Sequence, residues 1–150
     1  MVLPVVNAEE LFLKLVIVFT NEKGGVSICF PSGDLPIEEV KKKDVPPNVL
    51  SFVVEKSSLP HEDNDFFDAW EQSNGVVNIN MEKAKEITKN RLRIERTPLL
   101  AAQDIEFQKA LETGADVSEI ISEKQRLRNI TNLADSANSL DELRSISVKK

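Results

Sequence analysis

The spacing of the apolar residues changes near residue 80, and this change limits the possible folds more than any other feature of the sequence. Before it, apolar residues alternate with polar ones, as in "LKLVIVFTNEKGGVSICF", and a period of two is typical of β-strands. After it, "MEKAKEITKNRLRIER" and the segments that follow show the spacing of α-helices. We therefore predict an α+β fold, with a β-rich domain over residues 1–80 and a helical module over residues 81–150.

The first hairpin of the β-rich domain is predicted around the loop "NEKGG". Glycines in such a loop can adopt the positive φ that tight turns require. The strands on either side place alternate apolar residues on one face of a small antiparallel sheet. These residues are Leu13, Leu15, Ile17, Phe19, Val26, Ile28 and Phe30.

A short helix and a third strand are predicted next. In "PIEEVKKK", Pro36 suits a first helical position, and the acidic and basic residues follow the helix dipole. The segment "VLSFVVE" has strand spacing, with Leu50, Phe52 and Val54 on one face. The short helix is expected to pack against the sheet.

A second hairpin is predicted in "FFDAWEQSNGVVNIN". Asn74-Gly75 is a strong signal for a type I′ turn between two short β-rich runs. Helix is the competing interpretation of "DFFDAWE", because Phe66 and Trp70 lie four residues apart.

The helical module is predicted to contain an αα-hairpin. Thr97-Pro98 is expected to kink or restart the helix that begins at residue 81, and the segment after it has only a ragged apolar stripe. Gly114 is the expected left-handed residue after that segment, and Asp116 is the expected N-cap of the next helix, in an Asp-x-x-Glu box. A link this short makes the two helices antiparallel neighbours. The next helix is expected to pack through Val117, Ile120, Ile121, Leu127 and Ile130, and Ser139 to begin a last short helix.

The sequence contains no recognisable catalytic, cofactor-binding or metal-binding constellation. His61 is the only histidine and lies in the acidic loop "LPHEDND", which lacks the glycine and the bidentate glutamate of a calcium loop. Cys29 has no histidine near it in sequence and is expected on the polar side of its strand, where a small filler residue is a simpler interpretation than a nucleophile. We expect no enzyme activity and no cofactor.

Charge and hydropathy disfavour two further classes of function. The net charge of −6 disfavours a general nucleic-acid binder, because affinity for phosphate comes mainly from Lys and Arg. The apolar run "LFLKLVIVF" is far shorter than the roughly 20 residues that cross a bilayer, so a soluble protein is expected.

The helix over residues 81–96 is the candidate partner-binding element. It is strongly helix-forming, yet its apolar track is thin. We predict that Ile87, Arg91 and Ile94 face another polypeptide, since arginine is well suited to protein interfaces. The competing interpretation is an exposed helix that carries salt bridges and belongs to its own domain.

Four stretches carry a resemblance to a known family. They are "KLVIVFTNEKGGVSICFPS", "DVPPNV", "FFDAWEQSNGVVNINMEKAKEI" and "RTPLLAAQDIEFQKALETGADVSEIISEKQRLRNIT". Together they resemble a family of small, mostly uncharacterised proteins of tailed bacteriophages and prophages, over residues 13–146. The most specific parts are Ala69-Trp70, Met81 with Lys83-Ala84, Pro98-Leu99-Leu100, "EKQRLRNIT" and Asp141-Glu142-Leu143.

This resemblance implies a structural protein of the phage tail, baseplate or fibre-attachment region that binds other virion proteins. It implies a place in the virion tail, and in the host cytoplasm during assembly, and it leaves a homo-oligomer open. It supplies no catalytic residues. The chief alternative is a tail or tail-fibre assembly chaperone that is absent from the mature particle, and residues 1–12 lie outside the match.

Overall fold

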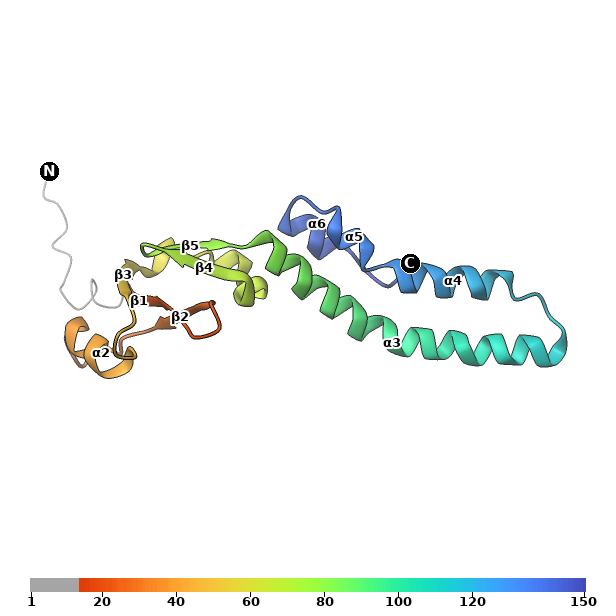
Figure 1. Ribbon diagram of the computed structural model, residues 1–150, viewed down its shortest axis with the longest axis horizontal. Helices are drawn as coiled ribbons and strands as arrows, with labels where there is room; N and C mark the ends of the chain where they lie inside the picture. Colours follow the sequence, from red (N-terminus) through yellow and green to blue (C-terminus); the bar gives the residue numbers. More distant parts are fainter. Residues whose placement is uncertain (1–13) are drawn as a thin grey trace, which may run out of the picture. The chain divides into compact units, whose positions relative to one another are not determined.

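A computed structural model describes residues 14–150, and it confirms the α+β class. The chain divides between Asn80 and Met81 into a β-rich unit and a helical unit. Figure 1 shows the order of the elements, with the strands in the first unit and four helices, α3 to α6, in the second.

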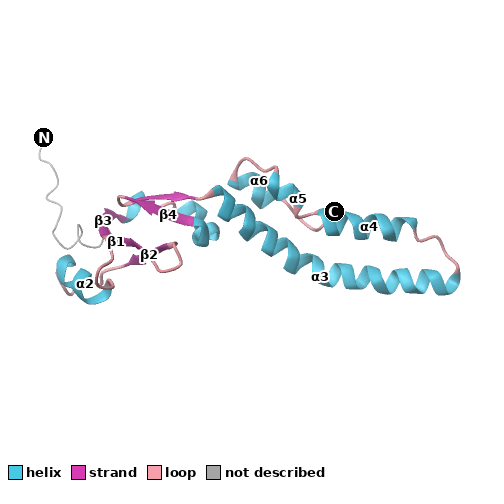
Figure 2. Cartoon of the chain, in the orientation of Figure 1, coloured by secondary structure: helices cyan, strands magenta, loops and turns pink. Residues whose placement is uncertain are grey.

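The β-rich unit is built on a three-stranded antiparallel sheet. Its strands are β1 (Leu15–Thr20), β2 (Val26–Cys29) and β3 (Ser51–Glu55), in the order β2-β1-β3. The predicted first hairpin is confirmed by the β1–β2 pairing, in which Val18 lies opposite Ile28. Its loop is closed by the Asn21 side chain, which accepts hydrogen bonds from the backbone N–H groups of Lys23 and Gly25. Figure 2 shows these strands in magenta.

Strand β1 is buried on both faces, whereas the sequence predicted a single apolar face. Val16 and Val18 pack with Trp70 on one side, and Ile17 and Phe19 pack with α2 on the other. Central strands covered on both sides are apolar throughout, which explains the run "LVIVF". The prediction that Val26 and Ile28 share a face with Ile17 and Phe19 is wrong, because the register places them on the opposite face, with Val16 and Val18. Cys29, predicted on the polar side of its strand, lies opposite Ile17 and packs half-buried on the face that α2 covers.

Helix α2 (Ile37–Asp44) covers the Ile17 face of the sheet through Val40. Pro36, predicted as the first helical residue, lies one position earlier, and its carbonyl accepts bonds from the N–H groups of Glu39 and Val40. Acidic residues occupy the first turn and lysines the last, as the helix dipole favours. The predicted face of β3 is correct for Phe52 and Val54, but Leu50 precedes the strand and is exposed.

Two short 3-10 segments, η1 (Lys56–Ser58) and η2 (His61–Ala69), lead into the second hairpin. This hairpin consists of β4 (Trp70–Ser73) and β5 (Val76–Ile79), paired antiparallel. Both interpretations of the preceding sequence are partly correct: residues 67–69 lie in the 3-10 segment η2, after a kink at Phe66, and the strand begins only at Trp70. Asn74 and Gly75 have φ values of 50° and 83°, which confirms the predicted positive-φ turn.

The helical unit contains α3 (Met81–Thr113), α4 (Ser118–Asn129), α5 (Asn132–Asp135) and α6 (Leu140–Ser145). Helix α3 runs for 33 residues and continues through Pro98, where a kink or a restart was predicted. Figure 1 shows it bending along its length towards α4, and proline causes such bends because it lacks the N–H that the preceding turn would bind. The Thr97 hydroxyl donates to the carbonyl of Arg93 at this point.

The link between α3 and α4 confirms the predicted helix stop. Gly114 has a φ of 66°, its N–H bonds to the carbonyl of Leu111, and the N–H of Ala115 bonds to the carbonyl of Ala110. These two bonds form a Schellman motif, which ends a helix on a left-handed residue.

The predicted N-cap of α4 is wrong by one position. Asp116 accepts from the backbone N–H and the hydroxyl of Ser118 rather than forming a box with Glu119, and Val117 occupies the N-cap position. The Asp116 carboxylate thus accepts a hydrogen bond from the backbone N–H two residues ahead, as in an Asx turn. In α6 the predicted cap is confirmed, because the Ser139 hydroxyl accepts from the N–H of Glu142.

Replacing Gly75 with alanine is expected to destabilise the protein more than replacing Gly114. Both glycines have positive φ, which costs about 1–2 kcal/mol for an L side chain. A Cβ at Gly114 meets no atom within 4 Å, whereas one at Gly75 lies 2.9 Å from the Cβ of Phe52. Chemical denaturation of the two variants should show an additional loss of about 1 kcal/mol or more for Gly75→Ala. Equal losses would contradict the close packing of this turn on β3.

Candidate functional site

The base of the helical unit has a well-formed core. Ala84, Thr88 and Leu92 are the buried residues of α3, spaced four apart along one face. Leu92 packs with Leu127, Ile130 and Val148. The Thr88 hydroxyl donates to the carbonyl of Ala84, so burial leaves this polar group satisfied. The thin apolar track expected from the sequence consists of Ala84, Ile87, Arg91, Ile94 and Pro98, and only Ala84 of these belongs to the buried stripe.

Basic side chains of α3 bind the C-terminal carbonyls of the other three helices. Carbonyls in the last turn of a helix have no partner within the helix, and the negative end of the dipole favours a cation there. Lys85, Arg91 and Arg96 each supply N–H donors to one helix end. The bonds run from Arg96 to the carbonyls of Leu127 (3.3 Å) and Arg128 (2.6 Å), from Lys85 to Asp135 (3.1 Å), and from Arg91 to Leu143 (3.3 Å) and Ile146 (3.0 Å).

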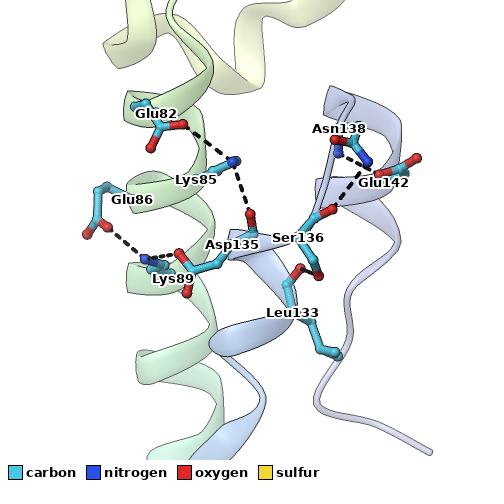
Figure 3. Close-up of polar contacts among 9 residues, drawn as sticks. All are labelled: Glu82, Lys85, Glu86, Lys89, Leu133, Asp135, Ser136, Asn138 and Glu142. Atoms are coloured by element: carbon cyan, nitrogen blue, oxygen red, sulfur yellow. Dashed lines mark hydrogen bonds and ion pairs between the residues drawn. The ribbon is translucent and has the colours of Figure 1, made fainter.

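Figure 3 shows the contact between α3 and α5 in this set. Lys89 lies 2.6 Å from the Asp135 carboxylate and 3.0 Å from that of Glu86. These hydrogen bonds raise the pKa of Lys89 above its usual value, with the bond to Asp135 as the largest cause. These lysines of α3 thus bind groups of their own unit, as the competing interpretation of a helix carrying salt bridges expects.

The C-terminal segment is tied to α4 by a second charged cluster. Glu123 accepts two hydrogen bonds from Arg126, at 2.9 and 2.7 Å, and its other ion pair is with Lys150 at 2.8 Å. Arg126 also donates to the carbonyl of Val148, whose side chain enters the core. The bonds from Arg126, followed by those from Lys150, lower the pKa of Glu123 from 4.5 to about 2.

Glu123→Gln is expected to lower the stability of the helical unit at neutral pH but not in strong acid. Because the pKa of Glu123 is lowered in the folded state, its contribution is complete above pH 4.5 and is lost as the pH falls from 4.5 towards 2. The melting temperatures of wild type and variant, followed by far-UV circular dichroism, should therefore converge in this interval. The control is Glu112→Gln, which makes the same change at an exposed position of α3. Equal stability of wild type and Glu123→Gln at neutral pH would contradict the role of the cluster.

Beyond this base, α3 and α4 form a hairpin that we call the distal arm, meaning residues 97–124. The structure describes every residue of the arm, and none of them is buried. The seam between the two helices holds half-buried residues such as Leu100, Phe107 and Ile120, and Lys124 bridges to Asp104 at 2.6 Å. Large apolar side chains are exposed on the arm at Leu99 (38%), Ile105 (56%), Leu111 (58%) and Ile121 (51%).

The three residues predicted to face a partner have different environments. Ile94 is 75% exposed, Ile87 is half-buried, and the guanidinium of Arg91 binds carbonyls of the C-terminal segment. Their role in a partner interface stays a prediction. Sequence reasoning missed the arm because its apolar stripe was ragged, and it placed Ile121 inside the hairpin, where the structure exposes it.

His61 and Cys29, the two residues weighed for chemistry in the sequence, lie in different environments. The Nε2 of His61 lies 2.6 Å from the carbonyl of Lys56, and Cys29 lies in the β-rich core, where burial raises the pKa of its thiol. Among residues 14–150, no group of three or more His, Cys, Asp or Glu could hold a metal ion. Over the same residues, no helix is both long and apolar enough to span a membrane.

Comparison with protein families, with curated protein sequences and with solved structures finds no match for this chain.

Proposed function

We propose that the chain is a structural protein of a bacteriophage tail, in the baseplate or fibre-attachment region, and that its distal arm docks on other virion proteins. The docking role is supported by one observation: no residue of the arm is buried, and four of its large apolar side chains are exposed. The sequence resemblance supplies the class of particle. The protein resides in the virion tail, after assembly in the host cytoplasm.

Most helical stability comes from the packing of an apolar face, and an isolated helix pair without a buried core gains little of it. When a partner covers exposed apolar area, the burial contributes about 25 cal/mol of favourable free energy per Å². The base of the unit holds the arm through Leu92, Leu127 and the cations of α3, so the arm projects a preformed surface. A preformed surface binds with a smaller loss of conformational entropy.

Mass spectrometry of purified tailed particles from cells that carry the gene tests the class of function. We expect peptides of the chain in the particles, at a constant ratio to the other tail proteins. Peptides found only in assembly intermediates would favour the alternative, a tail or tail-fibre assembly chaperone. Absence from both fractions would overturn the proposal.

Charged substitutions at the tip of the arm test the docking role. Leu111→Glu with Ile121→Glu should abolish incorporation into particles, because each places a charge on surface that a partner would bury. The matched control is Ser122→Glu with Gln125→Glu, which adds the same charge at exposed positions of α4. Helix content should stay at the wild-type level in both. Normal incorporation of the Leu111/Ile121 variant would refute docking through this surface.

A further inference from the structure

The outer face of α3 carries an exposed apolar stripe formed by Ile94, Pro98, Ala101 and Ile105. All four residues are exposed, with Ile94 at 75% and Ile105 at 56%. At 100° per residue they fall within about 60° of one another on the helix surface. The residues that face α4 and the core, among them Leu92, lie on the opposite side. The stripe is thus accessible from Ile94 to Ile105, and nothing else in the helical unit covers it.

We propose that the partner of this stripe is a second copy of the same chain, packed antiparallel across a two-fold axis. This inference rests on the proposed function and names the partner of a surface that begins at Ile94 and continues onto the distal arm. The two-fold axis passes between Leu99 and Leu100, at the middle of the stripe.

The spacing of the stripe is symmetric about that point. The intervals between its residues are four, three and four, so reversing the helix direction reproduces the same pattern. A two-fold interface requires such self-complementarity, because each surface meets its own copy. Ile94 of one chain then packs on Ile105 of the other, and Pro98 meets Ala101. The two central residues, Pro98 and Ala101, are small, which lets the helices approach closely. Figure 1 shows α4 on the inner side of the bend in α3, so α4 does not block the outer side.

The charges of α3 favour the antiparallel orientation. Residues 81–96 carry six basic and three acidic side chains, whereas residues 97–113 carry one basic and three acidic ones. Antiparallel packing places the basic half of each helix against the acidic half of the other, and a parallel pair would place like charges together.

The size of the stripe sets the expected strength of the dimer. At 1.5 Å per residue, Ile94 and Ile105 are about 17 Å apart. A seam of this length belongs to the small, reversible class of interfaces. We therefore expect a monomer–dimer equilibrium that depends on concentration.

Sedimentation equilibrium of the full chain tests the dimer. Wild type should dimerise, and Ile94→Glu with Ile105→Glu should weaken dimerisation by at least about tenfold while leaving helix content unchanged, because both positions are exposed. The control variant Ser122→Glu with Gln125→Glu adds the same charge on α4 and should dimerise like wild type. A wild-type chain that stays monomeric at all concentrations, or a dimer unaffected by the Ile94/Ile105 change, would overturn the inference.

Disulfide cross-linking tests the orientation. In a Cys29→Ser background, chains with Ile94→Cys mixed with chains with Ile105→Cys should cross-link under mild oxidation, and neither should cross-link with itself. Self-cross-linking of the Ile94→Cys chain alone would indicate a parallel pair and refute the proposed symmetry.

Failure of this inference is distinguishable from failure of the proposed function. A monomeric chain that is present in particles, with a cross-link from position 94 to a different virion protein, would refute the self-pairing and retain the docking role. A dimeric chain that is absent from particles would retain the self-pairing and refute the proposed function.

Discussion

Replacing Trp70 with alanine is expected to lower the free energy of unfolding of the β-rich unit by about 3–5 kcal/mol. Trp70 is 1% exposed and joins Val16, Val18 and Val26 in one cluster. Its Nε1 also donates to the carbonyl of Asp63 at 3.2 Å. Alanine would leave a large cavity between the sheet and the second hairpin and would leave that carbonyl without its donor.

Hydrogen exchange followed by mass spectrometry is the suitable measurement, because the variant lacks the only tryptophan. Amides of β1 and β4 should exchange much faster in Trp70→Ala than in wild type. Trp70→Phe keeps an aromatic ring and should retain most of the protection, and Phe30→Ala, at a side chain 57% exposed, should change little. Unchanged protection in Trp70→Ala would contradict the role of this cluster as the core.

Leu92→Ala is expected to destabilise the helical unit by about 2–5 kcal/mol. Leu92 is fully buried and contacts the cluster that joins α3, α4 and the C-terminal segment. The distal arm has no buried residue that could compensate, so the loss falls on the cluster at the base of the helical unit. The effect should exceed that of Leu99→Ala, because Leu99 is 38% exposed.

Two optical signals separate the two units in this experiment. Far-UV circular dichroism follows mainly the helical unit, and the fluorescence of Trp70 follows the β-rich unit, since the chain contains no other tryptophan and no tyrosine. Leu92→Ala should shift the dichroism transition to lower denaturant and shift the fluorescence transition less. A dichroism transition that coincides with that of wild type would contradict the assigned core.

Local sequence determined the positions where the backbone needs a special conformation. Asn74-Gly75 and Gly114 were predicted as turn residues, and each has positive φ in the structure. This works because positive φ is sterically difficult for most residues, so a glycine between two regular segments marks the place. The change of apolar period near residue 80 determined the α+β class for a similar reason, since the period follows from the geometry of a single strand or helix.

Tertiary packing decided which faces are covered. The alternation in β1 indicated one apolar face, but α2 and the second hairpin cover both, because separate parts of the chain return to opposite sides of the sheet. In α3 the sequence favoured the track through Ile87 and Ile94, yet the face of Ala84, Thr88 and Leu92 is buried. Ala84 and Thr88 are small and allow α5 and α6 to approach α3 closely. The spacing of apolar residues within α3 does not predict this, because it depends on segments elsewhere in the chain.

The candidate site was also determined partly by local sequence and partly by tertiary packing. The sequence by itself determined that a helix with a weak apolar pattern begins at residue 81 and determined where the hairpin turns. That this helix continues through Pro98 to Thr113 was decided by the structure. Only the tertiary structure decided that Arg91 binds the carbonyls of the C-terminal segment while Ile94 and Ile105 stay exposed. The physical reason is that exposure is a property of the neighbours as well as of the residue. Segments more than thirty positions away, around Leu127 and Leu143, occupy one side of α3 and leave the other side open.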